Sequence, residues 1–200
     1  MSAKPRTGKQ VHQFKITLKG SKPPIWRRIL VSPEMTLAGL HRVIQVVMPW
    51  WNCHLHEFRI RGNYYGIPNE EDGEDTTIAE NLVSVGKIAR SAGTRFTYVY
   101  DFGDDWQHDI LLEEILPAGS AASLPICVAG KLRCPPENSG SLWGYYDKLE
   151  ILKHPEHTEY ANTKEWLGRD WDPERFDIEG INQVLMEDFR TGSNGPAIPP

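Results

Sequence analysis

Hydrophobic and polar residues alternate along several stretches of the chain, and this period of two predicts β-strands. In residues 11–19, Phe14, Ile16 and Leu18 fall on one side and mainly polar residues on the other. Residues 25–31 and 53–60 alternate in the same way, and a short strand is expected to end at Gly66. The longest alternating stretch, residues 95–116, is interrupted by glycine and aspartate at 101–105, which predicts the turn of a β-hairpin.

Apolar residues at helical spacing predict helices elsewhere. A helix is expected over residues 37–48, since Thr36 can cap its start and Pro49 ends it. Residues 78–88 predict one short helical turn, and residues 145–152 and 160–167 predict two further helices. Asp172 followed by Pro173 predicts the start of a last helix. The whole pattern predicts an α+β fold: a mainly antiparallel sheet with one early helix and a C-terminal group of helices packed on it.

The chain of 200 residues is long enough for one domain with a sizeable core. We expect a single domain at residues 11–189, with a disordered arm at residues 1–10 and a disordered tail at residues 190–200. Residues 117–125 are expected to form a linker. Residues 127–144 are expected to form an irregular loop that packing, hydrogen bonds or a metal must hold in place.

Composition restricts the class of protein. No apolar run approaches the roughly 20 residues that span a bilayer, and the first ten residues lack the apolar stretch of a secretory signal. We therefore expect a cytoplasmic protein without membrane contact. The three cysteines are too few and odd in number for a disulfide framework, which favours reduced thiols or metal ligands.

The net charge of −5 is unevenly divided along the chain. Residues 1–65 carry 11 Lys and Arg against 2 Asp and Glu, whereas residues 66–200 carry 11 against 25. A basic first third can attract nucleic acid or an acidic partner. The simpler interpretation is that the basic strands pack beside the acidic remainder and are neutralised by it.

The densest group of chemically capable residues lies at the expected hairpin turn. We expect a cleft between this turn, the strand of residues 54–58 and the loop of residues 127–144. Its candidate binding residues are His54, His56, Asp101, Asp104, Trp106, His108, Glu137 and Trp143.

Metal binding is one hypothesis for these residues. His54 and His56 are two positions apart and can point the same way from a strand, and with Cys127 and Cys134 they are ligand types that zinc accepts. The spacing of six residues between the two cysteines is not that of a zinc finger or ribbon. The structural alternative is that the histidines form hydrogen bonds within the sheet and the cysteines are buried as small apolar residues.

Acid–base hydrolysis is a second hypothesis, in which Asp101, Asp104 and His108 supply a base and a carboxylate that orients it. The sequence contains no G-x-S-x-G elbow, no H-E-x-x-H motif and no phosphate-binding glycine loop. The structural alternative is that the aspartates cap the turn.

Binding through aromatic side chains is a third hypothesis. The candidate anchors are Trp50, Trp51, Trp106, Trp143 and Trp166. Tryptophans gathered on one accessible groove favour binding, whereas scattered buried ones favour a role in the core.

Several phrases of the sequence are similar to those of a known family. They are ITLKGSKPPIWRRILV, TLAGLHRVIQVVMPW, HLHEF, YDFGDDWQHDI, CVAGKLRCPPENSGSLWGYY and WDPERFDIEGIN. Through them, residues 11–189 resemble the plasmid pRiA4b ORF-3-like family. The resemblance implies a mixed α/β domain of bacterial and mobile-element origin, in a family without a characterised activity. Members often have a third cysteine where this chain has Ser139, so a metal site that used it would lack a ligand here.

Some members of that family carry the label transposon resolvase. Cleavage of a DNA strand needs a nucleophilic Ser or Tyr beside several arginines. This sequence has no Tyr-x-Arg-x-Ser start and no helix-turn-helix with a basic second helix.

The sequence therefore favours a non-enzymatic binding or interaction domain from a mobile element or an accessory gene, with an unidentified protein or small-molecule partner. Three alternatives stay open: a zinc-binding protein, a hydrolase that uses the cluster of His54, His56, Asp101 and His108, and a nucleic-acid-associated protein.

Overall fold

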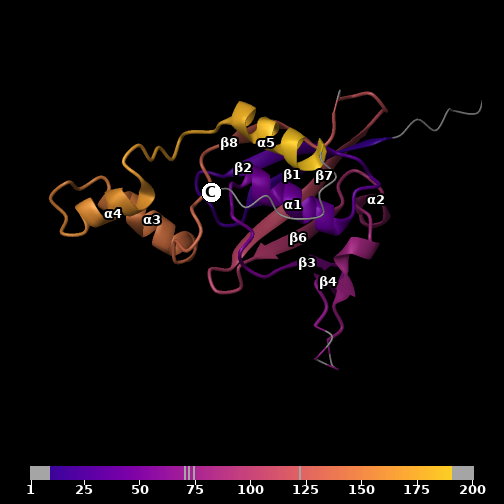
Figure 1. Cartoon of the computed structure of the whole chain (residues 1–200), viewed down its shortest axis with the longest axis horizontal. Coiled ribbons are helices and arrows are strands. Elements are labelled where there is room, and N and C mark those ends of the chain that lie inside the picture. The colour runs from indigo at the N-terminus through magenta and orange to yellow at the C-terminus, as the bar shows by residue number, and fades with distance from the viewer. Residues whose placement is uncertain (1–9, 70, 72, 74, 122, 191–200) are drawn as a thin grey trace, which may run out of the picture.

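The computed structural model describes residues 10–69, 71, 73, 75–121 and 123–190 (Figure 1). The arm expected at residues 1–10 and the tail expected at residues 190–200 lie outside this range, except for residues 10 and 190. Within it, eight strands form one sheet that five α-helices accompany. The predicted α+β class is confirmed. No helix of the described residues is long and apolar enough to cross a membrane.

The sheet has the strand order β5-β4-β3-β6-β7-β1-β2-β8. Neighbouring strands are antiparallel except β4 and β5, which run parallel. The strands are β1 (Val11–Leu18), β2 (Trp26–Val31), β3 (His56–Ile60), β4 (Asn63–Gly66), β5 (Ile78–Ala79), β6 (Arg95–Tyr100), β7 (Trp106–Leu116) and β8 (Ile126–Lys131). The β6–β7 hairpin lies in the middle of this order, so it joins the two halves of the sheet.

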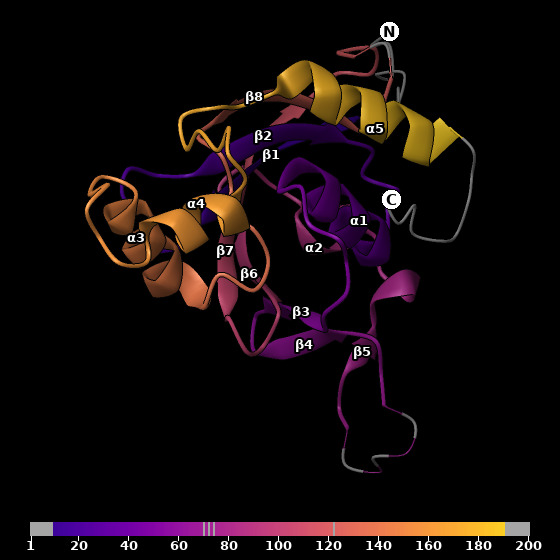
Figure 2. The ribbon, with the colours of Figure 1, turned by 60° about the vertical axis from the view of Figure 1, so that its left-hand side comes forward.

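Helix α1 (Leu37–Val47) lies on the concave side of the sheet, which curves around it in Figure 2. The hydroxyl of Thr36 accepts a hydrogen bond from the N–H of Gly39 at 3.1 Å, so the helix is capped at the predicted residue. The apolar face of α1 forms one core with the inward side chains of the strands, among them Phe14, Phe58 and Tyr98. Burial of this face explains why the helix forms at this place in the chain.

Three helices follow the last strand: α3 (Ser141–Ile151), α4 (Tyr160–Leu167) and α5 (Ile178–Arg190). The α3–α4 pair lies at one end of the molecule, on the left of Figure 1, and the buried ring of Tyr145 anchors α3 in the core. Helix α5 returns to the sheet and packs against β8 and α1, with Ile181 and Leu185 buried.

Two local predictions differ from the structure, and the helical turn expected within residues 78–88 is present beside other elements. The loop expected at residues 127–144 begins as strand β8, which pairs with β2 and forms one edge of the sheet. The last helix starts at Ile178 rather than at Asp172, because the carbonyl of Pro173 is engaged by the N–H of Arg133 at 2.9 Å. Residues 78–88 contain β5, a 3-10 turn (Glu80–Leu82) and the one-turn helix α2 (Val85–Ile88).

Ion pairs join the basic first third of the chain to the acidic remainder. The guanidinium of Arg28 makes two contacts with the carboxylate of Glu113, at 2.5 and 2.9 Å, across the open face of the sheet. Arg42 on α1 pairs with Asp188 on α5 at 2.9 Å. These contacts neutralise part of the charge asymmetry within the molecule.

Candidate functional site

The turn between β6 and β7 is built on the side chain of Asp101. Its Oδ1 accepts hydrogen bonds from the N–H groups of Gly103 at 3.0 Å and Asp104 at 3.3 Å. The N–H of Asp101 donates to the carbonyl of Leu55 at 2.9 Å, and Oδ2 of Asp104 accepts from the N–H of Gly140 at 3.2 Å. The three segments that were expected to border a cleft are therefore in contact at the hairpin tip.

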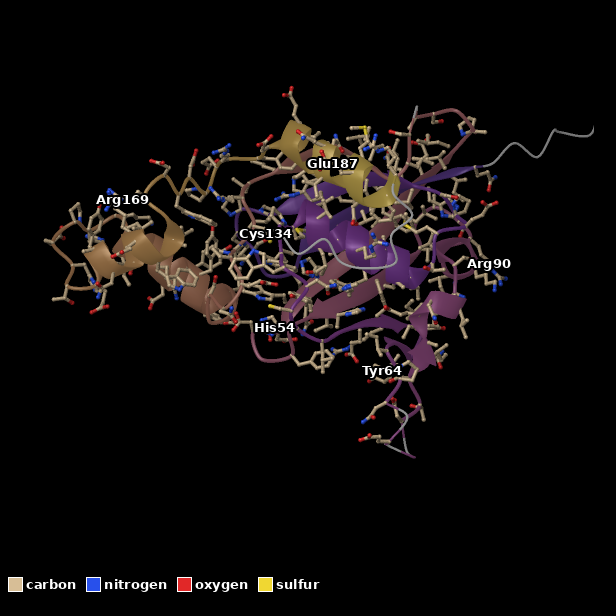
Figure 3. All side chains as sticks on the ribbon, viewed as in Figure 1. His54, Tyr64, Arg90, Cys134, Arg169 and Glu187 are labelled. Atoms are coloured by element: carbon tan, nitrogen blue, oxygen red, sulfur yellow. The ribbon has the colours of Figure 1, made fainter. Side chains whose placement is uncertain are left out.

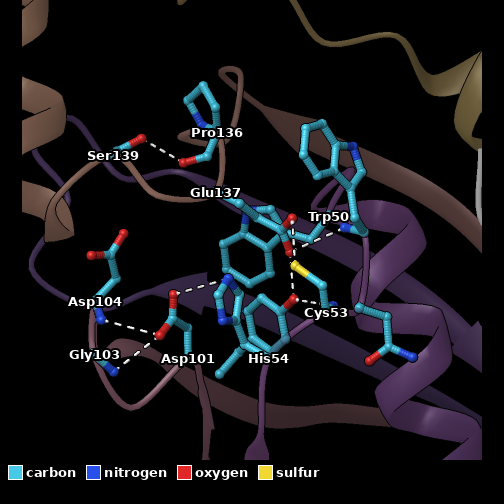
Figure 4. A network of polar contacts seen from close by, with 12 residues as sticks. Trp50, Cys53, His54, Asp101, Gly103, Asp104, Pro136, Glu137 and Ser139 are labelled. Atoms are coloured by element: carbon cyan, nitrogen blue, oxygen red, sulfur yellow. Dashed lines mark hydrogen bonds and ion pairs between the residues drawn. The ribbon is translucent and has the colours of Figure 1, made fainter.

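Glu137 is the centre of a buried polar network at this place (Figure 4). One carboxylate oxygen accepts hydrogen bonds from the hydroxyl of Tyr100 and from the N–H of Trp51, the latter at 3.1 Å. The other accepts from the thiol of Cys53 at 3.5 Å. Burial, together with the bond to Glu137 and its charge, raises the pKa of Tyr100, so this hydroxyl stays a donor. Glu137 thus ties the segment after α1 and strand β6 to the loop.

The loop that carries Glu137 is held by further hydrogen bonds. The indole N–H of Trp50 donates to the carbonyl of Pro135 at 3.0 Å, and the amino group of Lys148 on α3 donates to the carbonyl of Ser139 at 3.0 Å. The hydroxyl of the fully buried Ser139 donates to the carbonyl of Pro136. These hydrogen bonds hold in place a loop whose irregular sequence forms no long helix or strand.

Two of the five candidate tryptophans belong to the core. Trp50 is buried and stacks on Tyr100 with ring centroids 4.9 Å apart, and Trp106 is buried 5.9 Å from Trp50. The other three, Trp51, Trp143 and Trp166, are exposed.

The two candidate histidines of the β3 segment have different partners. Nε2 of His54 lies 3.5 Å from a carboxylate oxygen of Asp101. Nε2 of His56 lies 2.9 Å from Glu80, and its ring stacks on that of His41 with centroids 3.5 Å apart. The sequence spacing suggested that both imidazoles face one ion, but Nε2 of each lies beside a different carboxylate.

His108 is fully buried, and neither of its ring nitrogens has a hydrogen-bond partner within normal geometry. Burial lowers the pKa of His108 to about 3, and the nearby backbone of Trp106 and Tyr98 offsets only part of this effect. The imidazole is therefore neutral at physiological pH and is enclosed by the core.

The proposed zinc ligands do not meet. Cys127 and Cys134 are buried near Arg27, and burial raises the pKa of both thiols, that of Cys134 to about 12. The described residues contain no group of three or more His, Cys, Asp or Glu that could hold a metal ion. Among the described residues, His54, His56, Cys127 and Cys134 therefore do not come together as one ligand set.

Large apolar side chains project into solvent around the hairpin tip. We call Trp51, Leu55, Phe102 and Trp143 the tip surface, and these side chains are between 51 and 85% exposed. Trp143 also borders an open groove of about 830 Å³ between the hairpin turn, the start of α3 and the β1–β2 turn. The charged side chains of the groove are Lys19, Lys22, Asp104 and Asp105. Apolar anchors beside mixed charges are typical of protein-binding surfaces.

The family model described as plasmid pRiA4b ORF-3-like protein matches residues 10–180 of this chain. The chain belongs to this family. It is 35% identical over 176 residues to the uncharacterized protein y4hQ of Sinorhizobium fredii, covering 88% of this chain and 90% of that protein. It is also similar to the crystal structure of protein of unknown function MM3350 from Methanosarcina mazei Go1, with a TM-score of 0.78, 40% identity, and coverage of 86% of this chain and 98% of that one.

Sequence reasoning missed three residues that organise this member of the ORF-3-like family. Tyr100 and Cys53 contact Glu137, and Arg27 is a buried cation on the core side of β2. The signal for Arg27 was present, since it alternates with Ile25 and Ile29 on the inward face. Tyr100 also follows the inward pattern of β6, but its partner lies 37 residues away in a loop without periodicity.

Proposed function

We propose that this chain is a non-enzymatic binding domain that docks a partner protein on the tip surface. The single observation that carries the proposal is the grouping of Trp51, Leu55, Phe102 and Trp143 around one hairpin tip in spite of their exposure. When a partner removes exposed apolar side chains from water, the complex is stabilised by about 25 cal/mol for each Å² of apolar surface buried.

The backbone beneath these side chains is fixed before any partner arrives. The N–H of Trp51 is held by Glu137, and the carbonyl of Leu55 is held by Asp101. Phe102 belongs to the turn that Asp101 closes, and Trp143 follows Gly140, whose N–H donates to Asp104. A rigid surface loses little conformational entropy on association, which favours affinity.

The same site is poorly equipped for hydrolysis. Burial and the charge of Glu137 raise the pKa of the Cys53 thiol, which disfavours the nucleophilic thiolate. His108, the base of the hydrolase hypothesis, is enclosed in the core. These two features support binding over acid–base catalysis.

The family and the cysteines support a cellular setting for this protein and its partner. The plasmid origin in the family description supports a protein of a mobile element or accessory gene. The free thiols of Cys53, Cys127 and Cys134 suit the reducing conditions of the cytoplasm. We therefore propose that the partner is a cytoplasmic protein.

The proposal is tested with Trp143→Ala, which removes the most exposed anchor without touching the core. Tagged wild-type protein and variants are used to capture partners from a lysate of the source cell, and each captured protein is then purified and its Kd measured directly. We expect Trp143→Ala to weaken binding at least tenfold, as for an interface hot spot.

Leu82→Ala is the matched control, because Leu82 is an exposed apolar side chain of a 3-10 turn that belongs neither to the hairpin nor to the tip surface. It should leave the Kd unchanged. The proposal is wrong if every purified partner binds wild type, Trp143→Ala and Leu82→Ala equally well, or if no partner binds at all.

A further inference from the structure

A second pocket, which shares no lining residue with the tip surface, lies where the start of α5 meets β2 and the segment after β8. Its volume is about 330 Å³. Three arginines line it, Arg27, Arg133 and Arg175, together with the apolar side chains of Val46, Ile181 and Val184. Cys134, which also lines the pocket, is labelled between α5 and the α3–α4 pair in Figure 3. Two of these arginines, Arg133 and Arg175, come from the part of the chain beyond residue 65, which carries 25 Asp and Glu against 11 Lys and Arg.

Arg27 is only 1% exposed, and the hydrogen bonds of its guanidinium are to carbonyl groups. Nε donates to the carbonyl of Val47 at 2.7 Å, and Nη1 donates to those of Trp26 at 2.9 Å and Lys131 at 3.1 Å. Three hydrogen bonds therefore hold the guanidinium of Arg27 in a fixed position.

The charge of Arg27 has no carboxylate partner among the described residues. The ionisable groups that act on it are the thiols of Cys134 and Cys127, which are neutral because burial raises the pKa of both. Burial in turn lowers the pKa of Arg27. A buried charge without a counter-ion is costly, and an anion in the adjacent pocket would offset that cost.

The other two arginines add to the positive potential. Arg133 lies over the ring of Trp171 at 3.9 Å, and the proximity of Arg175 adds to burial in lowering the pKa of Arg133. The exposed Asp172 opposes this shift. Asp177 is the carboxylate that lines the pocket, and it is occupied: Oδ1 caps α5 by accepting from the N–H of Gly180 at 2.9 Å, and Oδ2 lies 3.7 Å from Arg175.

The wall of the pocket is shaped by the ring of Phe176. This ring covers the guanidinium of Arg27 at 4.6 Å, and it can do so because the neighbouring strand residue is Gly130. A Cβ at Gly130 would lie 2.5 Å from the ring. The close approach fixes an aromatic surface beside the three cations.

We propose that this pocket binds a small organic anion, in which a carboxylate or phosphate group meets the arginines and an apolar body lies against Phe176, Ile181 and Val184. Guanidinium groups hold both kinds of oxyanion through paired, charge-assisted hydrogen bonds. The pocket volume suits a single small molecule and is too small for a folded partner. The residues that line this pocket are not those of the tip surface, so the result of either binding test leaves the other proposal unaffected.

The test uses phenyl phosphate and benzoate as probes with the full chain, measured by isothermal titration calorimetry. We expect saturable binding of at least one probe, inorganic phosphate to bind more weakly than phenyl phosphate, and benzyl alcohol not to bind. Arg175→Gln should weaken probe binding by about tenfold or more, since it removes one charge-assisted contact from an exposed position.

Arg90→Gln is the control, because Arg90 is exposed and lies at the right-hand edge of Figure 3, away from Cys134. It should bind the probes like wild type. A second variant, Arg133→Gln, keeps the test valid if Arg175→Gln does not fold. The inference is overturned if neither probe binds wild type saturably below about 10 mM, or if both arginine variants bind as tightly as Arg90→Gln.

Discussion

At the scale of single residues, the main feature of this protein is the number of polar groups it encloses. Glu137 and Arg27 are buried with several hydrogen bonds each, whereas the ring nitrogens of His108 have no partner. A buried polar group without a partner lowers stability, and an ionisable one makes stability depend on pH.

His108 makes a pH prediction with a definite sign. Its pKa is about 3 in the folded protein against an ordinary value of 6.5, so the unfolded chain binds the proton more tightly. Stability is then lost as pH falls from 6.5 towards 3, by roughly 1.5 kcal/mol between pH 6.5 and pH 5 from this residue alone. We expect His108→Leu to remove that part of the loss, as measured by urea unfolding at both pH values.

His157→Leu is the control for this experiment, because His157 is exposed between α3 and α4. It should show the same acid destabilisation as wild type. His41, whose pKa burial also lowers to about 3, keeps its own contribution in both variants. If His108→Leu loses as much stability between pH 6.5 and pH 5 as wild type, His108 is not a neutral, buried imidazole in the folded protein.

The inward position of His108 follows from the sequence alone, since it alternates with Trp106 and Ile110 along β7. The sequence does not show, however, that its ring nitrogens lack hydrogen-bond partners. Hydrogen-bond partners come from other strands and loops, whose register the local pattern leaves open. For the same reason the sequence correctly predicts Asp101 in a turn, but it does not show that His54 lies beside Asp101 and His56 beside Glu80.

At the scale of elements, β8 shows how a side chain of a helix can supply the hydrogen bonds that an edge strand lacks. This strand forms an edge of the sheet and contains glycine and cysteine, so it carries no clear alternation. Asn182 on α5 accepts from the N–H of Cys127 and donates to its carbonyl, both at 2.8 Å. The side-chain amide thereby satisfies an edge position that would otherwise face water or another chain.

Asn182→Ala should therefore loosen the contact between α5 and β8. Two backbone groups of Cys127 lose their partner, and we expect the free energy of unfolding to fall by about 1–3 kcal/mol. Urea unfolding measures this loss. Gln183→Ala is the control, since Gln183 is the next residue of α5, is exposed, and donates a hydrogen bond to Glu187 at the surface. Equal stability of the two variants would mean that Asn182 does not hold the edge strand.

The sequence predicts well those elements whose own pattern of apolar and polar residues is enough to identify them. Strands β1, β2, β6 and β7 and helix α1 each bury one face, so periodicity identifies them. Strand β8 depends on a side chain 55 residues further along the chain. Asp172 and Pro173 carry the local signals of a helix start. However, the carbonyl of Pro173 accepts a hydrogen bond from the N–H of Arg133, which ties this backbone to the segment after β8.

At the scale of the whole molecule, the sheet and the α3–α4 pair differ in how they are held. Strands β1, β6 and β7 have hydrogen-bonded neighbours on both sides and lie over the main core. Helix α4 buries only Thr163 and Leu167, and it packs chiefly on α3 at the end of the molecule seen in Figure 1. Local opening requires less free energy where fewer apolar contacts are broken.

Native-state hydrogen exchange should resolve these two levels of stability. Amides of β1, β6 and β7 are expected to exchange only through global unfolding, because opening any one of them breaks the central sheet. Amides of α4 should exchange at least about 100-fold faster, because that helix can detach while the ring of Tyr145 keeps α3 in place. Addition of urea below the unfolding midpoint should accelerate the strand amides more steeply, since their opening exposes more surface. Equal rates and equal urea dependence in α4 and β7 would instead make the chain one cooperative unit, and the helical end would then be as firmly built as the sheet.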